Sequence, residues 1–337
     1  MKAGVYTGPG VIEVREWPEP TAKPGEVKIK IAYAGICGTD VELLHDRFGL
    51  GQRTSGPRVF GHEATGTIVG LGPGLKGEWN VGQRVALGFR AACGVCYYCR
   101  TKREHFCEHD SRASGAFAEY GTFPEGALYA LPDDVGFELA ALVEPLSIAV
   151  RAVDCAGIKN GQTLAISGGG TIGLLALTVA LDEGACDVLV MEPRVAKREM
   201  ALSMGARVAV DPFSEDVRAA AAELTGGRGF DAFIESSGDL RLAAAALELV
   251  DKGGTIVWVG VAYPADAEVQ VGPFQLYLKE LTVRSPRMAP YSFERTLRLL
   301  SKLDIGSVVT DTYALDEIAE AFRNHERGES GKTLIRM

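Results

Sequence analysis

The chain has 337 residues, of which 47% are hydrophobic and 23% are charged, and its formal net charge is −9. This length exceeds a single ordinary core and predicts two domains, while the acidic charge argues against nucleic acid as a partner. No apolar run reaches the roughly 18–20 residues of a membrane-spanning helix, and the first residues do not resemble a signal or transit peptide. The expected location is therefore the cytoplasm, with no membrane partner.

Residues 1 to about 150 carry the pattern of short β-strands. The runs Val27–Tyr33, Ala64–Val69 and Arg84–Leu87 are bounded by Gly and Pro, as strands usually are. Near the end of this part the pattern changes, and Glu138–Ala156 predicts one helix rich in Ala, Leu and Val.

Four residues of this first part have side chains suited to zinc. Cys37 lies in a glycine-flanked turn, His62 and Glu63 are adjacent, and Glu144 lies in an apolar helical segment where an unpaired charge would be costly. A thiolate, an imidazole and one or two carboxylates supply three protein ligands and leave a position open, as in catalytic zinc sites. Spacing alone does not connect these four residues, and each by itself fits a packed core position.

A cysteine loop, Cys93-x2-Cys96-x2-Cys99-x7-Cys107, follows these strands. Four thiolates from one short segment converge on a tetrahedral zinc ion at about 2.3 Å each and leave no open position. Disulfides are disfavoured because the chain has 7 cysteines, an odd number, and no secretory leader is apparent. The loop therefore predicts a structural zinc site.

The second part alternates strands with helices, which predicts a parallel sheet covered by helices on both faces. The predicted strands are Thr163–Ser167, Asp187–Met191, Arg207–Val210, Phe230–Ile234 and Thr255–Val259, and the clearest helices are Thr171–Glu183 and Val195–Met204. Two amphipathic helices, Ser292–Lys302 and Leu315–Asn324, and a strand, Thr333–Arg336, close the chain.

A glycine-rich turn joins the first of these strands to the helix that follows. Gly168 permits a tight turn, Gly170 lets the backbone approach a pyrophosphate, and Gly173 allows close packing of helix on strand. The N-terminus of that helix offers free N–H groups and a positive dipole end to phosphates. In this context, GxGxxG predicts a dinucleotide site, although a simple packing turn would have the same composition.

The next strand is followed by Glu192, 19 residues after Gly173. A carboxylate there accepts hydrogen bonds from ribose hydroxyls and repels a 2′-phosphate, so NAD is favoured over NADP. The cations Arg194, Lys197 and Arg198 follow closely and keep NADP open as the less favoured cofactor.

The chain resembles the zinc-dependent medium-chain dehydrogenases/reductases of the alcohol dehydrogenase superfamily, in their polyol, sorbitol and threonine dehydrogenase branch. The resembling stretches, in order, are Gly35–Asp40, Gly61–Glu63, the cysteine loop, Gly115–Tyr120, Val143–Leu146, Gly168–Gly173 and Glu235–Gly238. The resemblance implies an α/β fold in which a GroES-like β-barrel catalytic domain (residues 1–150, completed by 286–337) is joined to a doubly wound Rossmann domain (residues 151–285) that binds NAD.

Roles for the candidate residues follow from this resemblance. Cys37, His62 and Glu63 would bind a catalytic zinc ion. Glu144 matches a position that in relatives either ligates the metal directly or approaches it as the zinc shifts. Thr39 matches the hydroxyl that passes the alcohol proton toward solvent.

The resemblance also implies a second zinc ion and a set of cofactor contacts. The cysteine loop would hold the structural zinc, which makes two zinc ions per chain. Besides the glycine turn, the positions matching cofactor contacts are Ile172, Glu192 and Lys197, and Arg287 resembles an arginine near the nicotinamide and the substrate.

Two departures from the family pattern bear on the substrate. Many polyol and threonine dehydrogenases have a histidine where this chain has Glu42, which makes threonine oxidation less expected. His45, one helical turn later, either takes over in the proton relay or is a solvated surface histidine. The segment between Cys107 and Gly115 is about four residues shorter than in most relatives, so substrate selectivity does not transfer.

The expected function is the zinc- and NAD-dependent, reversible oxidation of a secondary alcohol on a polyol, sugar or aminocyclitol. L-threonine 3-dehydrogenase and simple alcohol dehydrogenase are the alternatives within the same class. A non-catalytic dinucleotide-binding scaffold protein is the alternative from another class. The family further implies a small-molecule substrate and a homodimer or homotetramer.

Overall fold

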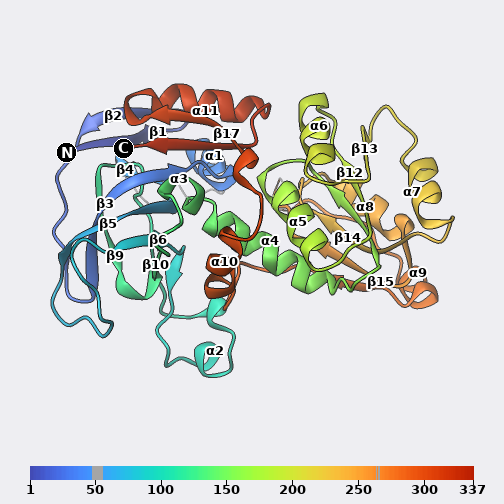
Figure 1. The fold of residues 1–337 in the computed structure, drawn as a ribbon, viewed down its shortest axis with the longest axis horizontal. Coiled ribbons are helices and arrows are strands. Elements are labelled where there is room, and N and C mark those ends of the chain that lie inside the picture. The colour runs from blue at the N-terminus through green and yellow to red at the C-terminus, as the bar shows by residue number, and fades with distance from the viewer. Residues whose placement is uncertain (48–55, 263, 265) are drawn as a thin grey trace. The chain divides into compact units, whose positions relative to one another are not determined.

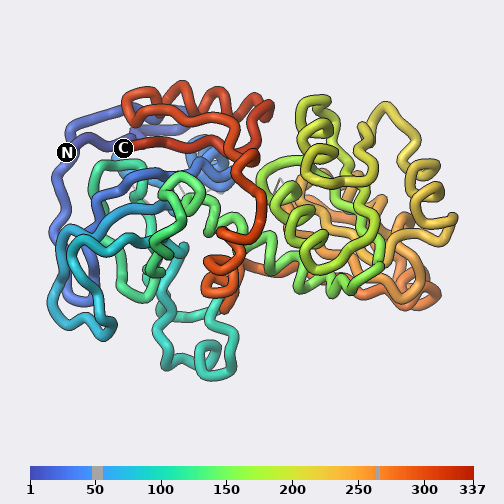
Figure 2. The backbone as a smooth tube through the Cα atoms, viewed as in Figure 1, coloured from blue at the N-terminus to red at the C-terminus, as the bar shows by residue number. Residues whose placement is uncertain are grey.

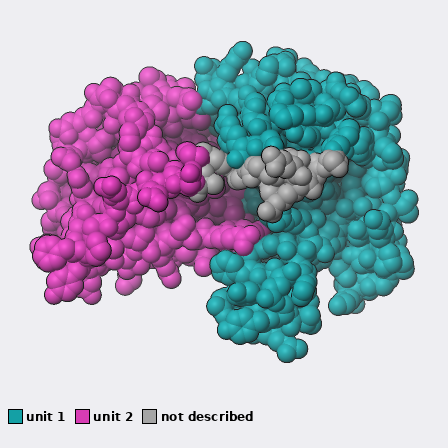
Figure 3. Space-filling model, turned by 180° about the vertical axis from the view of Figure 1, so that it is seen from behind, with its two compact units in different colours: residues 1–144, 293–302, 309–337 teal, residues 145–292, 303–308 magenta. Residues whose placement is uncertain are grey.

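The computed structural model describes residues 1–47, 56–262, 264 and 266–337 of the chain (Figure 1). Two compact units are present (Figure 3). Unit 1 comprises Met1–Glu144, Phe293–Lys302 and Val309–Met337, and unit 2 comprises Pro145–Ser292 and Leu303–Val308. Residues 145–150, 286–292 and 303–308, which were predicted to belong to the first domain, belong to unit 2 by this division. Among the described residues, no helix combines the length and the apolar character needed to cross a membrane.

Unit 1 is built on β-sheets. A seven-stranded sheet has the order β10-β6-β5-β3-β18-β17 with β9 also pairing β3, a three-stranded sheet has the order β2-β1-β4, and β7 pairs β8. Its strands are β1 (Lys2–Gly8), β2 (Val11–Glu16), β3 (Glu26–Gly35), β4 (Arg58–Val59), β5 (Glu63–Leu71), β6 (Arg84–Leu87), β7 (Arg90–Ala91), β8 (Ser111–Arg112), β9 (Tyr120–Pro124), β10 (Leu128–Ala130), β17 (Val309–Ala314) and β18 (Lys332–Arg336). Its helices are α1 (Gly38–Leu44), α2 (Tyr97–Arg100), α3 (Phe137–Ala140), α10 (Phe293–Leu300) and α11 (Ile318–Arg327).

Unit 2 contains a six-stranded parallel sheet with the order β13-β12-β11-β14-β15-β16. Its strands are β11 (Thr163–Ser167), β12 (Asp187–Met191), β13 (Val208–Val210), β14 (Phe230–Glu235), β15 (Val250–Trp258) and β16 (Thr282–Arg284). The helices are α4 (Val143–Ala156), which begins in the last residues of unit 1, α5 (Thr171–Asp182), α6 (Val195–Ser203), α7 (Val217–Thr225), α8 (Leu240–Leu249) and α9 (Pro273–Lys279). The predicted parallel sheet is confirmed.

Strand burial differs between the units as their topology requires. In β3, the buried side chains Val27, Ile29 and Ile31 alternate with Lys28 and Lys30, because one face of this strand covers a core and the other does not. In β11, three successive residues, Leu164, Ala165 and Ile166, are fully buried, as expected for a parallel strand with both faces covered.

The single helix predicted over Glu138–Ala156 is wrong, since two helices, α3 and α4, replace it. Proline has no N–H, so Pro145 cannot donate to the carbonyl of Ala141 as an uninterrupted helix requires. Pro145 instead occupies the first turn of α4, where that donor is not needed. The chain thereby turns at Ala141 and Leu142, two residues before the predicted site residue Glu144.

The end of the chain returns to unit 1, as the red segment of the tube shows (Figure 2). There β18 pairs antiparallel with β3, with Leu334 opposite Gly35, and parallel with β17. Because β3 leads directly to Cys37, the last strand lies beside the segment that carries the first predicted zinc ligand.

Candidate active site

Three of the predicted zinc ligands meet in unit 1. Ligand atoms of Cys37, His62 and Glu63 all lie within 4.8 Å of one another. Antiparallel pairing of β3 and β5 sets Gly35 opposite Glu63, and this pairing unites residues that are distant in the sequence. His62 and Glu63 are buried and Cys37 is half-buried. A thiol, an imidazole and a carboxylate are a donor set suited to zinc, so the residues present fit the metal that the sequence predicts.

Asp40 orients two of these ligands, a role that the sequence analysis did not assign. One of its oxygens accepts a hydrogen bond from the Cys37 amide at 3.0 Å, and the other lies 3.4 Å from His62 Nδ1. Burial by itself lowers the pKa of His62, yet the charge and hydrogen bond of Asp40 hold it well above the usual value. With Nδ1 facing Asp40, the other ring nitrogen is left for a metal. The Cys-x2-Asp spacing in a helix-opening turn was the available sequence signal.

Lys332 also reaches this cluster, and no local sequence pattern marks it. Its side chain is 2% exposed, forms an ion pair with Glu63, and donates a hydrogen bond to the Ile36 carbonyl at 2.9 Å. Burial acts to lower the pKa of Lys332, but Glu63 and Cys37 raise it above its usual value overall. A Cβ on Gly35 would overlap both Glu63 and Lys332, so the glycine makes room for the pair.

Glu144, the fourth predicted ligand, is buried but does not belong to the three-residue cluster. Burial raises its pKa to about 7, and the negative charges of Glu63 and Asp40 act in the same direction. His62 and Lys332 act in the opposite direction. The charges of the cluster therefore act on Glu144, although Glu144 is not among the three residues whose ligand atoms lie together.

The proton-relay candidates lie on α1. Thr39, two residues after Cys37, is half-buried near the start of this helix. Glu42, which replaces the histidine of many relatives, pairs with Arg47 at 3.0 Å. His45 Nε2 lies within hydrogen-bond distance of Glu326 Oε1 on α11, at 2.7 Å, so this ring is held by a partner rather than solvated alone.

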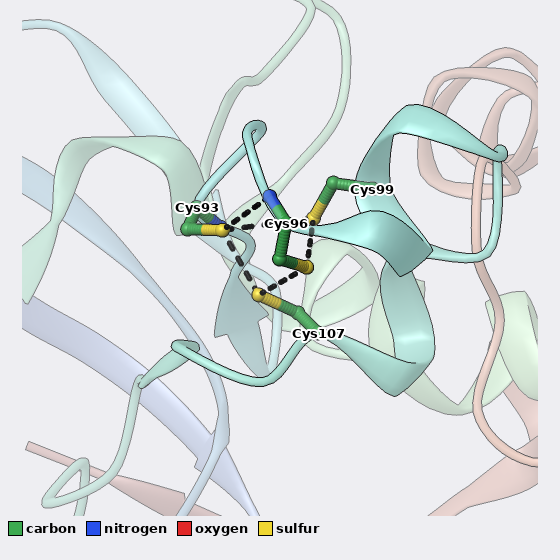
Figure 4. Close-up of side chains that lie close together, drawn as sticks. All are labelled: Cys93, Cys96, Cys99 and Cys107. Atoms are coloured by element: carbon green, nitrogen blue, oxygen red, sulfur yellow. Dashed lines mark hydrogen bonds between the residues drawn. The ribbon is translucent and has the colours of Figure 1, made fainter.

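The cysteine loop forms a second cluster in unit 1 (Figure 4). Sulfur–sulfur distances are 3.5 Å for Cys96–Cys99 and 3.9 Å for both Cys93–Cys99 and Cys96–Cys107. A tetrahedron with Zn–S bonds of about 2.3 Å requires sulfur separations of about 3.8 Å. The geometry therefore fits a closed zinc site.

Backbone N–H groups face several of these sulfurs. The Cys93 amide lies 3.3 Å from the Cys107 sulfur, and the Cys96 amide lies 3.4 Å from the Cys93 sulfur. Backbone N–H groups of Glu108 and Cys99 lower the pKa of Cys96 to about 6, whereas burial and the neighbouring Cys96 thiol raise the pKa of Cys99 to about 12. All seven cysteines lie in the described part of the chain and are free thiols.

Arg90 fastens the cysteine loop to the rest of unit 1. Its guanidinium donates to the Asp110 carboxylate at 3.0 Å through Nε and to the His105 carbonyl at 2.5 Å through Nη1. Both partners lie near Cys107, so the loop is held at its end as well as by its own sulfurs.

In unit 2, the glycine turn follows β11. Gly168 has φ +94°, and Gly173 could not carry a side chain because its Cβ would lie 1.8 Å from the Gly168 carbonyl oxygen. Gly170 directly precedes α5, and no atom lies within 4 Å of the place where its Cβ would be. This open space leaves room for a ligand to approach the backbone. The turn after β14 packs on Gly168 through Ser236 and Ser237, at the point where the strand order reverses. Ligands of open α/β sheets bind at such points.

Glu192 lies beside this turn. Its two oxygens accept hydrogen bonds from the Gly169 amide at 2.8 Å and the Arg194 amide at 3.0 Å. Lys197 is buried, and that burial lowers its pKa. Of the other two predicted cofactor contacts, Ile172 is half-buried in the first turn of α5, and Arg287 is exposed in the loop that precedes α10.

A cavity of about 250 Å³ in unit 2 was not predicted from the sequence. Met191, at the end of β12, and Leu242 contribute apolar lining, and Phe213 and Arg241 also line it. The Arg241 guanidinium lies 4.1 Å from the centre of the Phe213 ring. Met191, which lines the cavity, directly precedes Glu192 in the sequence.

Comparison with known proteins agrees with this geometry. Residues 23–133 match the family model of the alcohol dehydrogenase GroES-like domain, and residues 171–302 match that of the zinc-binding dehydrogenase. The chain is 34% identical over 346 residues to L-threonine 3-dehydrogenase of Pyrococcus horikoshii, covering 99% of this chain and 98% of the relative. It is 33% identical over 346 residues to sorbitol dehydrogenase of Halalkalibacterium halodurans, covering 99% of each.

Among solved structures, a zinc-binding dehydrogenase of Sinorhizobium meliloti bound to NADP superposes with a TM-score of 0.91 at 30% identity. The superposition covers 100% of this chain and 99% of that chain. These matches confirm the predicted fold class, a GroES-like domain joined to a doubly wound parallel sheet.

Proposed function

The chain belongs to the zinc-binding alcohol dehydrogenase family, and on that premise we propose that it oxidises a secondary alcohol of a polyol, sugar or aminocyclitol with NAD. The observation that carries the proposal is the convergence of Cys37, His62 and Glu63 in a chain that also has a cofactor-type glycine turn. A non-catalytic scaffold would need the turn but not the three-ligand cluster.

Zinc bound by Cys37, His62 and Glu63 would supply a Lewis acid that polarises the alcohol oxygen. Asp40 keeps the His62 ring turned so that one nitrogen is free for the metal. Thr39 carries the alcohol proton toward solvent from its half-buried place on α1, and the Glu144 carboxyl is buried within the electrostatic influence of His62 and Glu63. The cysteine loop would hold a second, structural zinc ion.

For the cofactor, the proposal is NAD, with NADP the less favoured alternative. Both oxygens of Glu192 are fixed by backbone amides, so its negative charge is held where a ribose 2′-phosphate would approach. The adenine ring would enter the neighbouring cavity, where Phe213 and Arg241 offer a flat aromatic and cationic wall. Lys197, Ile172 and Arg287 complete the proposed contacts.

Replacing Glu192 tests this assignment. We expect Glu192→Ser to lower kcat/KM with NAD and to raise it with NADP, shifting the ratio by about 100-fold, because a like-charge contact costs several kcal/mol. Initial rates with both cofactors measure the ratio, and Glu199→Ser, which removes an exposed carboxylate of the following helix α6, is the matched control. A wild-type enzyme that prefers NADP would contradict the assignment.

The polyhydroxylated substrate is supported by the relative named sorbitol dehydrogenase, whereas the relative named L-threonine 3-dehydrogenase favours the alternative. Glu42, paired with Arg47, stands where many polyol and threonine dehydrogenases have a histidine, so this position makes threonine oxidation less expected without singling out the polyol. NADH absorbance with a panel of polyols, sugars, aminocyclitols, simple alcohols and L-threonine tests the choice. A strong preference for threonine or for a simple alcohol would replace the proposed substrate class.

We also propose that the protein works in the cytoplasm as a homo-oligomer. Phe274, Tyr277 and Leu278 on α9 are 70%, 78% and 59% exposed, and such clustered apolar groups mark contact surfaces. Nearby in sequence, β16 ends the described sheet, and a strand edge can pair with the same edge of a second copy.

Oligomerisation through α9 predicts that Leu278→Glu converts the assembly to monomers. Light scattering after size exclusion measures the mass, and Val81→Glu is a matched control because Val81 is 65% exposed in unit 1. The proposed contact would be wrong if the wild-type protein were a monomer, or if Leu278→Glu left the mass of the assembly unchanged.

A further inference from the structure

Lys332 is a buried cation with no assigned part in the reaction proposed above. It is 2% exposed, pairs with Glu63, and donates to the Ile36 carbonyl at 2.9 Å. Burying an ammonium group is costly unless it is paired with good geometry. Packing alone therefore does not explain why Lys332 lies beside the predicted zinc ligand Glu63.

The fold delivers Lys332 to a fixed place. It is the first residue of β18, and the following Thr333 and Leu334 are fully buried. Leu334 pairs with Gly35, which sets the lysine beside the link from β3 to Cys37. The space above Gly35 is filled by Glu63 and the end of the Lys332 side chain. The register of β18 on β3 therefore determines that Lys332 contacts Glu63.

The charge balance of the cluster gives the contact a consequence. A zinc ion held by the Cys37 thiolate and the Glu63 carboxylate would already be neutralised, and two further buried acidic residues, Asp40 beside His62 and Glu144, act on the same cluster. Each additional carboxylate oxygen that donates electrons to such a zinc ion makes the ion a weaker Lewis acid. A cation bound to Glu63 opposes this effect.

We propose that Lys332 is a positioning residue that occupies one carboxylate oxygen of Glu63, so that Glu63 offers the metal only its other oxygen. The lysine thereby keeps the metal electron-poor and effective on the alcohol. This inference rests on the proposed function of the same site.

The expected result for Lys332→Met separates this role from simple bracing. Without the lysine, Glu63 can give both oxygens to zinc, so zinc should leave no faster than from wild type when a chelator is added. At the same time, kcat should fall roughly 10–100-fold, the usual effect of losing a partner of a metal ligand. The zinc-free protein should lose the most thermal stability, because Glu63 is then buried unpaired, and so zinc should raise Tm more than in wild type.

Three further variants keep the test decisive. Lys332→Arg retains the charge and should restore most of kcat. In a Glu63→Gln background, Lys332→Met should change neither kcat nor zinc release further, because the lysine acts through the Glu63 carboxylate. Lys279→Met is the control for loss of a structural lysine, since Lys279 donates to carbonyls of Leu247, Glu248 and Val250 at the end of α8. It should lower Tm with and without zinc by the same amount.

Zinc release, kcat and the zinc-dependent shift in Tm are measured on the full-length protein. Faster zinc release from Lys332→Met, unchanged kcat, or a further effect in the Glu63→Gln background would each overturn the positioning role. If the wild-type protein contains no zinc at Cys37 or oxidises no alcohol, the proposed function itself fails. The wild-type measurements therefore distinguish the two failures.

Discussion

Cys37→Ser is expected to lower kcat for alcohol oxidation by roughly 10³-fold or more. Removing the thiolate takes away one of three protein ligands, and Lewis-acid stabilisation by zinc is worth several kcal/mol, with about 1.4 kcal/mol for each factor of ten. His62→Ala should have a similar effect, since it removes the ligand that Asp40 orients. NAD binding should persist in both variants, because the glycine turn and Glu192 belong to unit 2.

The measurements are steady-state rates, zinc content and NAD affinity by fluorescence or calorimetry. Cys186→Ser is the matched control, because Cys186 is an exposed thiol of unit 2 that is in neither cysteine-containing cluster. It should keep both zinc ions and normal activity. A metal-free His62→Ala protein that still turned over substrate would rule out the proposed mechanism.

Cys96→Ser is expected to have the largest effect on structure. Zinc held by four thiolates contributes on the order of 10 kcal/mol of folding free energy to the segment that it organises. Three thiolates hold zinc far less firmly, so the variant should lose one zinc ion per chain and the segment between β7 and β8 should unfold. Arg90 and its contacts to Asp110 and His105 would remain but could not order the loop alone.

Limited trypsin digestion with mass spectrometry measures this unfolding, because Arg100, Lys102 and Arg103 lie inside the loop. Rapid cleavage there is expected in Cys96→Ser, and slow cleavage in wild type and in Cys155→Ser, whose buried cysteine belongs to neither cluster. Equal cleavage of all three proteins, or two zinc ions in Cys96→Ser, would show that the loop needs no metal.

Features made by neighbouring residues could be predicted from the sequence. The cysteine loop and the glycine turn each lie within one short segment, so the spacing alone indicates which side chains meet. The alternation of strands and helices in unit 2 was equally visible, because each fully buried parallel strand forms a continuous apolar run.

Features made by strand pairing could not be predicted in this way. Cys37 and Glu63 meet because β3 pairs with β5, and Lys332 joins them because β18 pairs with β3. No local pattern reports such pairings, so resemblance to a family had to connect the first two, and the lysine was missed. The break before α4 was predictable in principle, since Pro145 cannot continue a helix through Ala141.

The central claim is that zinc held by Cys37, His62 and Glu63 makes this chain an alcohol dehydrogenase. The most direct test is to return zinc stepwise to metal-free protein and to measure NADH formation from a polyol at each zinc content. If the cysteine loop fills first, the rate should stay near zero up to one zinc ion per chain and rise with the second. Full activity in the metal-free protein, or with zinc in the cysteine loop alone, would contradict the claim.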